Sequence, residues 1–468
     1  MLPTSLRFRR ALALLAVLPA FLAGAVVPAA AAGSGSTTSP AWSQFQGGPA
    51  HTGSTPGITP AQPPYSRAWT FEEPDSDLGF ASPLIVGNVA VALGSKAVYG
   101  VDLSTGKQVW RVARTGGPIT EPAAGTAGGK TLIVYLDGGS NQQASNLVAI
   151  DAETQKQLWS LGLGATSVSG VSVDGSTAFV GDIQGVLHAV DLSKGTSAWT
   201  SKGVGRIEAP PAIADGIVYT GSRELTQGNA TVRAVDESDG TQKWTFTQKQ
   251  LTSGSGITVS DGRAISGFTD RLARAFDASD GTGEWTALMS NALSPRGAPA
   301  AGTGAVYLAD LAGSVERVSA DSGSREWGYR FNSIRSLPIP YLDFFSSPVL
   351  TGPSVLIGLG DGRLGAVSAA TGHLQWEGDT GPGALGGIAL GDGIVVVAKQ
   401  GVNGALIGFR HDPSGTLLDE PSPTELDAGQ LLGRFAAAFV IVFGLALFAG
   451  LLLRRRDSTS DEPIGAES

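Results

Sequence analysis

The sequence predicts an all-β protein, an eight-bladed β-propeller of four-stranded antiparallel blades, followed by one C-terminal transmembrane helix. Three observations predict this fold class. A short sequence motif that ends in tryptophan recurs along the chain, and short strand-like runs separate its copies. One long uncharged apolar stretch lies near the C-terminus. We take the elements in chain order, beginning with the N-terminus.

The first 32 residues have the layout of a signal peptide. Arginines come first, an apolar run follows from Ala11 to Val27, and a string of small residues precedes Gly33. The pair Arg9-Arg10 leaves two export routes open, the general route and the twin-arginine route. We therefore expect the mature chain to begin near Gly33, with residues 33–64 as a leader segment whose start, 33–40, reads as flexible.

The other end of the chain predicts a membrane anchor. Residues 433–453 are long and apolar enough to span a bilayer, and three arginines follow at 454–456. Because basic residues stay on the cytoplasmic side, residues 454–468 should form a cytoplasmic tail and the bulk of the chain should be extracytoplasmic. We predict a single-pass protein of the cell membrane, with residues 411–432 as a flexible linker.

Composition narrows the range of partners. The chain has no cysteine, so its exported part must be stabilised by burial rather than by disulfides. Its net charge is -9, and lysine and arginine cluster only at the membrane boundary. This pattern argues against nucleic acid as a partner.

Tryptophan sets the repeat, with eight of the nine tryptophans lying 40 to 49 residues apart. A period in the low forties is typical of a four-stranded propeller blade. We expect each of these indoles to seal one blade against the next. The eight are Trp69, Trp110, Trp159, Trp199, Trp244, Trp285, Trp327 and Trp376.

The interior of one repeat shows what the unit is. Residues 207–246 contain four short runs, PPAIA, GIVYTG, TVRAVD and QKWTF, separated by turn-forming residues. Gly240 stands where a hairpin needs a positive φ. No run has helical length or period, so each repeat is a four-stranded meander.

Eight such units occur, and the ends of the chain complete the last one. The eighth unit reaches residues 405–410 without a tryptophan-bearing fourth strand, whereas residues 65–71 form such a strand with no blade before it. Pairing the two would close a propeller over residues 65–410 and remove the exposed sheet edges.

The recurring pattern [AG]-[VI]-D-x-x-[ST]-G-x-x-x-W resembles the pyrroloquinoline-quinone (PQQ) type propeller repeat. That family includes quinoprotein alcohol dehydrogenases and non-enzymatic outer-membrane assembly lipoproteins of the BamB kind, and residues 42–53 are similar to its opening segment. Three copies depart from the pattern, with Ser319 and Ser368 in place of aspartate and Gln155 in place of glycine. We expect those turns to differ in shape.

The dehydrogenase branch implies a neighbouring cysteine pair, a tryptophan floor, a calcium site and an aspartate base. Here cysteine is absent, and every tryptophan except Trp42 is already assigned to a blade seam. We therefore predict no catalytic, cofactor or metal residues, with PQQ and calcium as the alternative. The four histidines are dispersed and are expected to be packing or surface residues.

Loop lengths predict where a partner binds. Antiparallel order puts the second-to-third loops and the blade links on one side, here called the insertion face, and the short third-to-fourth turns on the other, the short-turn face. The insertions at 138–146, 222–230 and 328–347 all belong to the insertion face. The last is rich in apolar groups, so it either packs over the channel as a lid or forms a patch for another protein. The candidate partner residues are Tyr329, Phe331, Ile334, Leu337, Tyr341, Phe344 and Phe345.

These observations favour a non-enzymatic, membrane-anchored interaction scaffold whose partners are envelope or membrane proteins. Two alternatives stay open, a quinoprotein-like oxidoreductase with a degenerate site and a sensor that binds a small ligand in the central channel.

Overall fold

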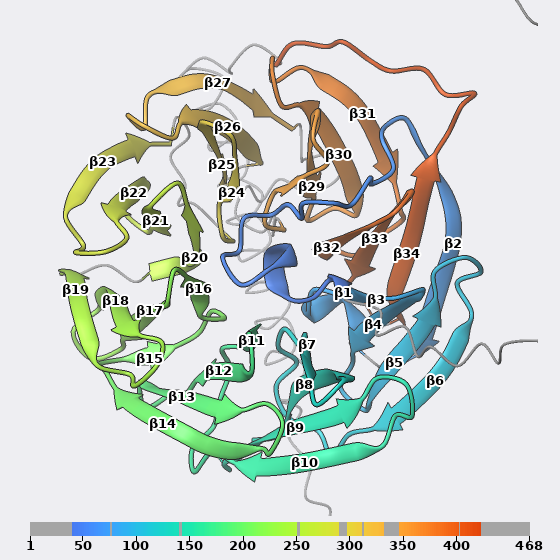
Figure 1. Ribbon diagram of the computed structural model, residues 1–468. Coiled ribbons are helices and arrows are strands. Elements are labelled where there is room, and N and C mark those ends of the chain that lie inside the picture. The colour runs from blue at the N-terminus through green and yellow to red at the C-terminus, as the bar shows by residue number, and fades with distance from the viewer. Residues whose placement is uncertain are drawn as a thin grey trace, which may run out of the picture. The chain divides into compact units, whose positions relative to one another are not determined.

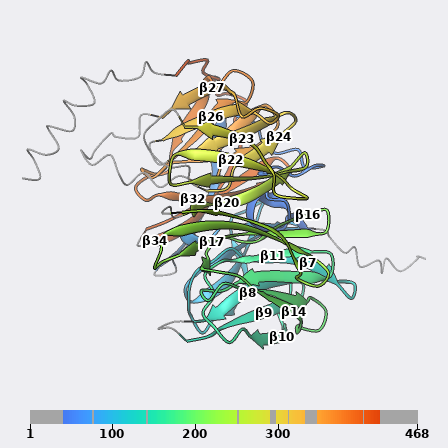
Figure 2. The same ribbon diagram turned by 90° about the vertical axis from the view of Figure 1, so that its left-hand side faces the viewer.

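The computed structural model describes residues 40–74, 77–139, 143–249, 253–289, 297–310, 313–331, 346–401 and 403–422. Within these ranges the strands form eight antiparallel sheets arranged in sequence order around a ring (Figure 1), which Figure 2 shows from its side. The predicted eight-bladed propeller is confirmed. The predicted signal peptide, transmembrane helix and tail lie outside the described residues. In the part of the chain that the structure describes, no helix has the length and hydropathy needed to cross a bilayer.

Each blade runs from an inner first strand to an outer fourth strand. Blade 1 consists of β3 (Leu84–Val86), β4 (Val89–Leu93), β5 (Ala97–Asp102) and β6 (Gln108–Ala113). Blade 2 consists of β7 (Ala123–Ala127), β8 (Lys130–Gly138), β9 (Ser145–Asp151) and β10 (Gln157–Gly162). Blade 3 consists of β11 (Val171–Asp174), β12 (Thr177–Gly181), β13 (Val186–Asp191) and β14 (Thr196–Lys202). Blade 4 consists of β15 (Arg206–Ile207), β16 (Ala212–Ala214), β17 (Ile217–Glu224), β18 (Asn229–Asp236) and β19 (Gln242–Gln248).

The second half of the ring continues the same order. Blade 5 consists of β20 (Ser253–Ser260), β21 (Arg263–Phe268), β22 (Leu272–Asp277) and β23 (Gly283–Leu288). Blade 6 consists of β24 (Ala300–Gly302), β25 (Ala305–Ala309), β26 (Ser314–Ser319) and β27 (Arg325–Arg330). Blade 7 consists of β28 (Val349–Leu350), β29 (Ser354–Gly358), β30 (Arg363–Ser368) and β31 (Leu374–Asp379). Blade 8 consists of β32 (Leu385–Gly391), β33 (Ile394–Lys399), β34 (Asn403–His411) and β2 (Tyr65–Pro74).

The ring is closed by the pairing of β2 with the last strand, β34. β2 pairs antiparallel with β34 from Tyr65 opposite His411 to Pro74 opposite Asn403. This pairing is the closure expected from the sequence, and it gives blade 8 its outer strand from the beginning of the chain.

The third-to-fourth turns share one geometry despite their sequence differences. In the turn after β5, Asp102 Oδ1 accepts hydrogen bonds from the Ser104 and Thr105 amides, and Gly106 has a φ of 69°. Ser319 Oγ accepts from its turn amides at 3.3 and 3.4 Å, and Gln155 adopts a φ of 57°. The expectation that the departing copies differ in shape is wrong, because serine supplies the same acceptor and glutamine tolerates the left-handed region here.

The tryptophans lie between blades. Trp244 Nε1 donates to the Ala278 carbonyl of blade 5 at 2.9 Å, and its ring occupies the space that a Cβ on Gly281 would need. Glycine in each of these turns therefore leaves room for the indole of the preceding blade. Five more tryptophans make the equivalent hydrogen bond to the next blade, namely Trp69, Trp159, Trp199, Trp285 and Trp327.

Trp110 and Trp376 occupy seams of a different kind. Trp110 packs against the hydrophobic cluster shared by blades 1 and 2, in which blade 2 contributes Ile133 and Ile150, and the blade 2 turn has glutamine in place of glycine. Trp376 faces blade 8, in which no hairpin joins β34 to β2, and it packs edge-on against Tyr65 and Phe409 at centroid distances of 5.1 and 6.0 Å. Aromatic rings thus replace the hairpin turn where the ring closes.

The described part of the leader lies on the axis of the ring. β1 (Pro40–Trp42) pairs with β3, and the 3-10 helix η1 (Phe45–Gly47) lies at the centre of the ring (Figure 1). We call residues 42–59 the axial segment. Its carbonyls accept hydrogen bonds from inner-strand amides in turn, Ser43 from Ala124, Pro49 from Ile213, Ala50 from Val259, Thr52 from Ala301 and Gly53 from Leu350. Thr59 accepts from Gly393, in the turn between β32 and β33.

Side chains complete this belt of contacts. The Gln44 side chain donates to the Val173 carbonyl at 2.9 Å and accepts from the Val173 amide at 2.8 Å, which adds blade 3. The axial segment therefore contacts all eight blades and fills the centre of the channel.

The start of the predicted flexible linker is also attached. Residues 412–422, here called the rim segment, run along the outside of blade 7 (Figure 1). Backbone hydrogen bonds join Leu374 to Glu420 and Leu418 to Gln375, and Ser422 accepts a hydrogen bond from the Arg330 amide. The expectation of a flexible spacer from residue 411 is wrong for this stretch, because the rim segment adds a short edge pairing to β31.

Candidate functional site

A central cavity of about 300 Å³ lies on the ring axis above the axial segment, on the insertion face. Phe45 and Gln46 of the axial segment line it from within, and the link before blade 1 contributes Phe80 of η2 (Leu78–Phe80). Residues from the entrances of several other blades complete the wall. In the part of the chain that the structure describes, the axial segment forms the floor of this cavity, here called the cup, and the rest of its lining comes from the insertion face.

Two carboxyl groups face this cavity. Glu208 accepts from Arg223 at 2.7 Å and lies 3.0 Å from Arg206 Nε, so its charge is balanced. Glu121 has no such cation in the described residues, and desolvation raises its pKa to about 7. A Cβ on Gly170 would lie 3.0 Å from Glu121 Oε2, so the glycine leaves room for the carboxyl.

The lining does not suit the quinone cofactor that the repeat family implies. PQQ carries three carboxylates, whereas the described lining residues include Glu121 and Glu208 and no lysine or arginine. A ligand of that charge would be repelled with no counter-charge at hand. The chemistry of the cup favours a neutral or cationic group. Among the described residues, no group of three or more His, Asp or Glu side chains could hold a metal ion.

The histidines have separate structural roles. His51 is buried in the axial segment, where Nδ1 contacts the Ile257 carbonyl and Nε2 contacts Ser172 Oγ. Burial lowers the pKa of His51 to about 4, so the ring is neutral at physiological pH. His373 and His411 contact Asp419 and the Gln62 carbonyl at the exposed rim.

The predicted partner residues divide into two groups. Tyr329 and Phe331 are 5% and 1% exposed, pack edge-on at 4.9 Å and belong to the core of blades 6 and 7. Phe331 fits against Gly365, where a side chain would clash with its ring. The expectation that these two lie in an exposed loop is wrong, because β27 extends to Arg330 and carries them into the seam. Ile334, Leu337, Tyr341, Phe344 and Phe345 lie outside the described residues.

Other apolar side chains are exposed on the insertion face. They lie in blade links, at a second-to-third loop and at the end of an outer strand, and they are Phe80, Val204, Leu225 and Leu288. Leu225 and Leu288 are 62% and 57% exposed. Two comparably exposed residues, Val109 and Leu158, lie instead near the starts of the outer strands β6 and β10.

Comparison with known families assigns the chain. A family model described as that of the outer membrane protein assembly factor BamB matches residues 143–256 and 225–412, which together are more than half of the chain. The chain belongs to the BamB family. A BamB of Yersinia pestis is 25% identical over 284 residues, which are 58% of this chain and 60% of the relative. The chain therefore spans less than two thirds of that relative.

Solved structures share the fold. BamB from Moraxella catarrhalis superposes with a TM-score of 0.57 at 18% identity, over 74% of this chain and 99% of that one. A quinohemoprotein alcohol dehydrogenase from Pseudomonas putida superposes with a TM-score of 0.62 at 14% identity, over 82% of each chain. At these identities the likeness shows the propeller alone, which BamB-family proteins and quinoprotein dehydrogenases have in common.

Sequence reasoning missed the two carboxyl groups of the cup. Both occur just before the first strand of a blade and close to a proline, in TEPAA around Glu121 and IEAPPA around Glu208. The first strands surround the axis, so an acid at their entrance must face the channel. The position of these two acids in their repeats is visible in the sequence. It indicates a cavity-lining role only once the cavity on the insertion face is known.

Proposed function

We propose that this protein is a membrane-anchored, extracytoplasmic interaction scaffold without a cofactor, which binds other envelope proteins through its insertion face. The supporting observation is that large apolar side chains are more than half exposed on this face, at Phe80, Val204, Leu225 and Leu288. Exposed apolar groups among polar surroundings are the usual contacts for another protein.

Family membership supports the same proposal. The matched relatives are described as outer membrane protein assembly factors. Assembly of other proteins requires contact with them, which fits a binding surface on this propeller. The signal peptide expected from the sequence would export the propeller, and the expected C-terminal helix would tether it to the membrane. The short-turn face, from which the chain leaves blade 8 at His411, would then look toward the membrane.

The test is proximity labelling in cells with the full-length chain. A double substitution, Leu225→Asp with Leu288→Asp, places charge on the insertion face without altering a buried group. The matched control is Val109→Asp with Leu158→Asp, which makes the same change at outer-strand sites that are 53% and 40% exposed.

We expect the insertion-face variant to lose most of the neighbours labelled by the wild type, and the control to keep them. An identical set of neighbours for all three proteins would contradict the proposed binding face.

A further inference from the structure

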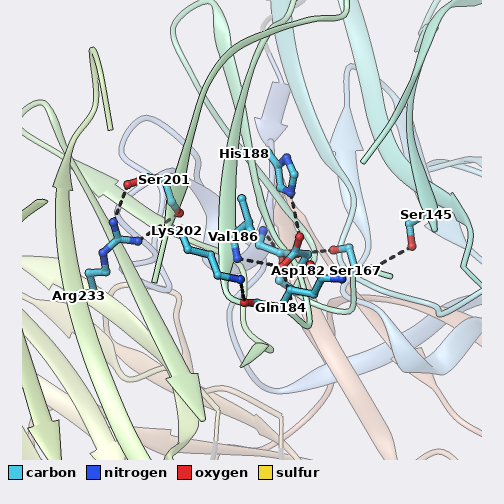
Figure 3. A network of polar contacts seen from close by, with 11 residues as sticks. Ser145, Ser167, Asp182, Gln184, Val186, His188, Ser201, Lys202 and Arg233 are labelled. Carbon is cyan, nitrogen blue, oxygen red and sulfur yellow. Dashed lines mark hydrogen bonds and ion pairs between the residues drawn. The ribbon is translucent and has the colours of Figure 1, made fainter. Parts of the chain in front are cut away.

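A second cavity, of about 270 Å³, lies between blades 3 and 4 on the insertion face and is lined by a buried arginine. Arg233 is 7% exposed and comes from the middle of β18. Its Nη2 donates to Ser201 Oγ at 2.5 Å and its Nη1 to the Ser201 carbonyl at 3.3 Å (Figure 3). Its Nε donates to Gln242 Oε1 at 3.1 Å. All three acceptors are neutral.

In blades 3 and 5, the basic side chain at the position equivalent to Arg233 is paired with an aspartate of the same blade. Three residues before the turn aspartate, blade 3 has His188, blade 4 has Arg233 and blade 5 has Arg274. His188 Nε2 lies 3.1 Å from Asp182 Oδ2, and the guanidinium of Arg274 donates to both oxygens of Asp270. Arg233 has no carboxylate partner among the described residues.

The register of the strands explains the missing acid. Thr177 of blade 3 and Ile217 of blade 4 each pair with a turn aspartate, so the position of Asp182 corresponds to Ser222. Ser222 Oγ donates to the Val204 carbonyl at 2.7 Å. The acid of the blade 4 loop, Glu224, accepts instead from Asn229 at 3.0 Å.

The rest of the lining adds positive charge and hydroxyl groups. Lys202 lines the cavity, and its Nζ donates to the Gln184 carbonyl at 2.6 Å (Figure 3). Thr220, Thr231, Thr245 and Thr247 contribute hydroxyl groups, and no described lining residue is acidic. Desolvation lowers the pKa of Arg233, which reflects the cost of burying a cation without a counter-charge.

We propose that this cavity binds a small molecule that carries an oxyanion, a phosphate or a carboxylate, with Arg233 as its main ligand and Lys202 at its mouth. A guanidinium matches the paired oxygens of such a group and binds it with charge-assisted hydrogen bonds. Thr220 and the hydrogen-bonded pair Thr231 and Thr247 offer hydroxyl groups to the remaining oxygens, whereas Thr245 Oγ already donates to the Val232 carbonyl at 3.3 Å. In blades 3 and 5 an aspartate supplies the negative charge next to the basic side chain. In blade 4 the bound ligand supplies it. The proposal goes beyond the scaffold function and does not depend on it.

The test uses the full-length chain in detergent, with inorganic phosphate as the probe at constant ionic strength. The informative variant is Gln242→Glu, which is isosteric and puts a carboxylate where Arg233 Nε already donates. The matched control is Gln108→Glu, because Gln108 pairs with Val101 as Gln242 pairs with Val235, and Tyr99 stands where Arg233 would be.

We expect phosphate to raise the thermal unfolding midpoint of the wild type and of Gln108→Glu. Gln242→Glu should bind phosphate at least about tenfold more weakly by calorimetry, because its own carboxylate competes for Arg233. Without phosphate, its midpoint should exceed that of the wild type.

Acetate in a parallel titration distinguishes carboxylates from phosphates as the natural class. Absence of a phosphate effect on the wild type, or an equal effect on all three proteins, would overturn the site.

Discussion

The axial segment and the rim segment both lie outside the repeats, but they differ in burial and in the number of blades that they contact. Both are rich in Gly, Pro, Ser and Thr, and neither belongs to a repeat. The axial segment is largely enclosed and hydrogen-bonds to every blade, whereas the rim segment is mostly exposed and pairs with one outer strand. The difference shows that the contribution of an irregular segment to stability depends on whether it covers the inner or the outer strand edges of the blades. Inner edges converge on the axis and must be satisfied, whereas outer edges can bond to water.

The largest effect should follow from removing one axial side chain. Gln44→Ala leaves the amide and the carbonyl of Val173 without their partner. Each buried, unsatisfied backbone group costs about 1–3 kcal/mol, so the free energy of unfolding should fall by about 2–5 kcal/mol. Urea denaturation measures this loss. A change below about 1 kcal/mol would show that water replaces the side chain. It would also show that the axial segment contributes no more to stability than the rim segment does.

Acid should weaken the axial segment through His51. Because burial lowers the pKa of His51 to about 4, the unfolded chain binds the proton more readily than the native one. Stability from this residue is therefore complete above about pH 6.5 and declines as the pH falls toward 4, by roughly 3 kcal/mol. Glu121 acts in the opposite direction over part of this range, because its pKa is raised to about 7.

The variant His51→Gln isolates the histidine contribution. The difference in free energy of unfolding between wild type and variant should shrink by roughly 3 kcal/mol between pH 7 and pH 4. Denaturation curves at a series of pH values measure it, and a difference that does not vary with pH would contradict the assignment.

The smallest effect is expected at the rim. Asp419 Oδ1 lies 2.6 Å from His373 Nδ1, but the carboxyl side chain is 88% exposed. Exposed ion pairs are worth about 0–1 kcal/mol, so Asp419→Ala should lower the free energy of unfolding by less than 1 kcal/mol. A loss comparable to that of Gln44→Ala, measured in the same urea series, would erase the distinction between rim and axis.

The repeats were predictable because each carries its own information. Tryptophan spacing, turn glycines and the unpaired strand at Trp69 are local signals, and together they determine the blade number and the closure. The turns at Ser319 and Gln155 keep their shape because their backbone is also held by the neighbouring strands, a constraint that no single turn sequence reveals.

The remaining features depend on contacts between distant residues. The axial segment looks like a loop because its Gln and His side chains are polar, and only the eight inner edges give them partners. Tyr329 and Phe331 look exposed until Gly365, far along the chain, is seen to leave room for a ring. Arg233 was detectable in principle, because aligning TVRAVD with LARAFD shows the arginine, and its loop has Ser222 where blade 3 has Asp182.

The closure of blade 8 also governs how the chain can be made. Tyr65 pairs with His411, which is synthesised almost 350 residues later. A growing polypeptide therefore carries an unpaired β2 through most of its synthesis. Contacts this distant in sequence form slowly, and a bare strand edge invites pairing with other chains. Until β34 is synthesised, the nascent protein is therefore an open array of blades at risk of aggregation, and a chaperone that shields β2 should raise the yield of folded protein.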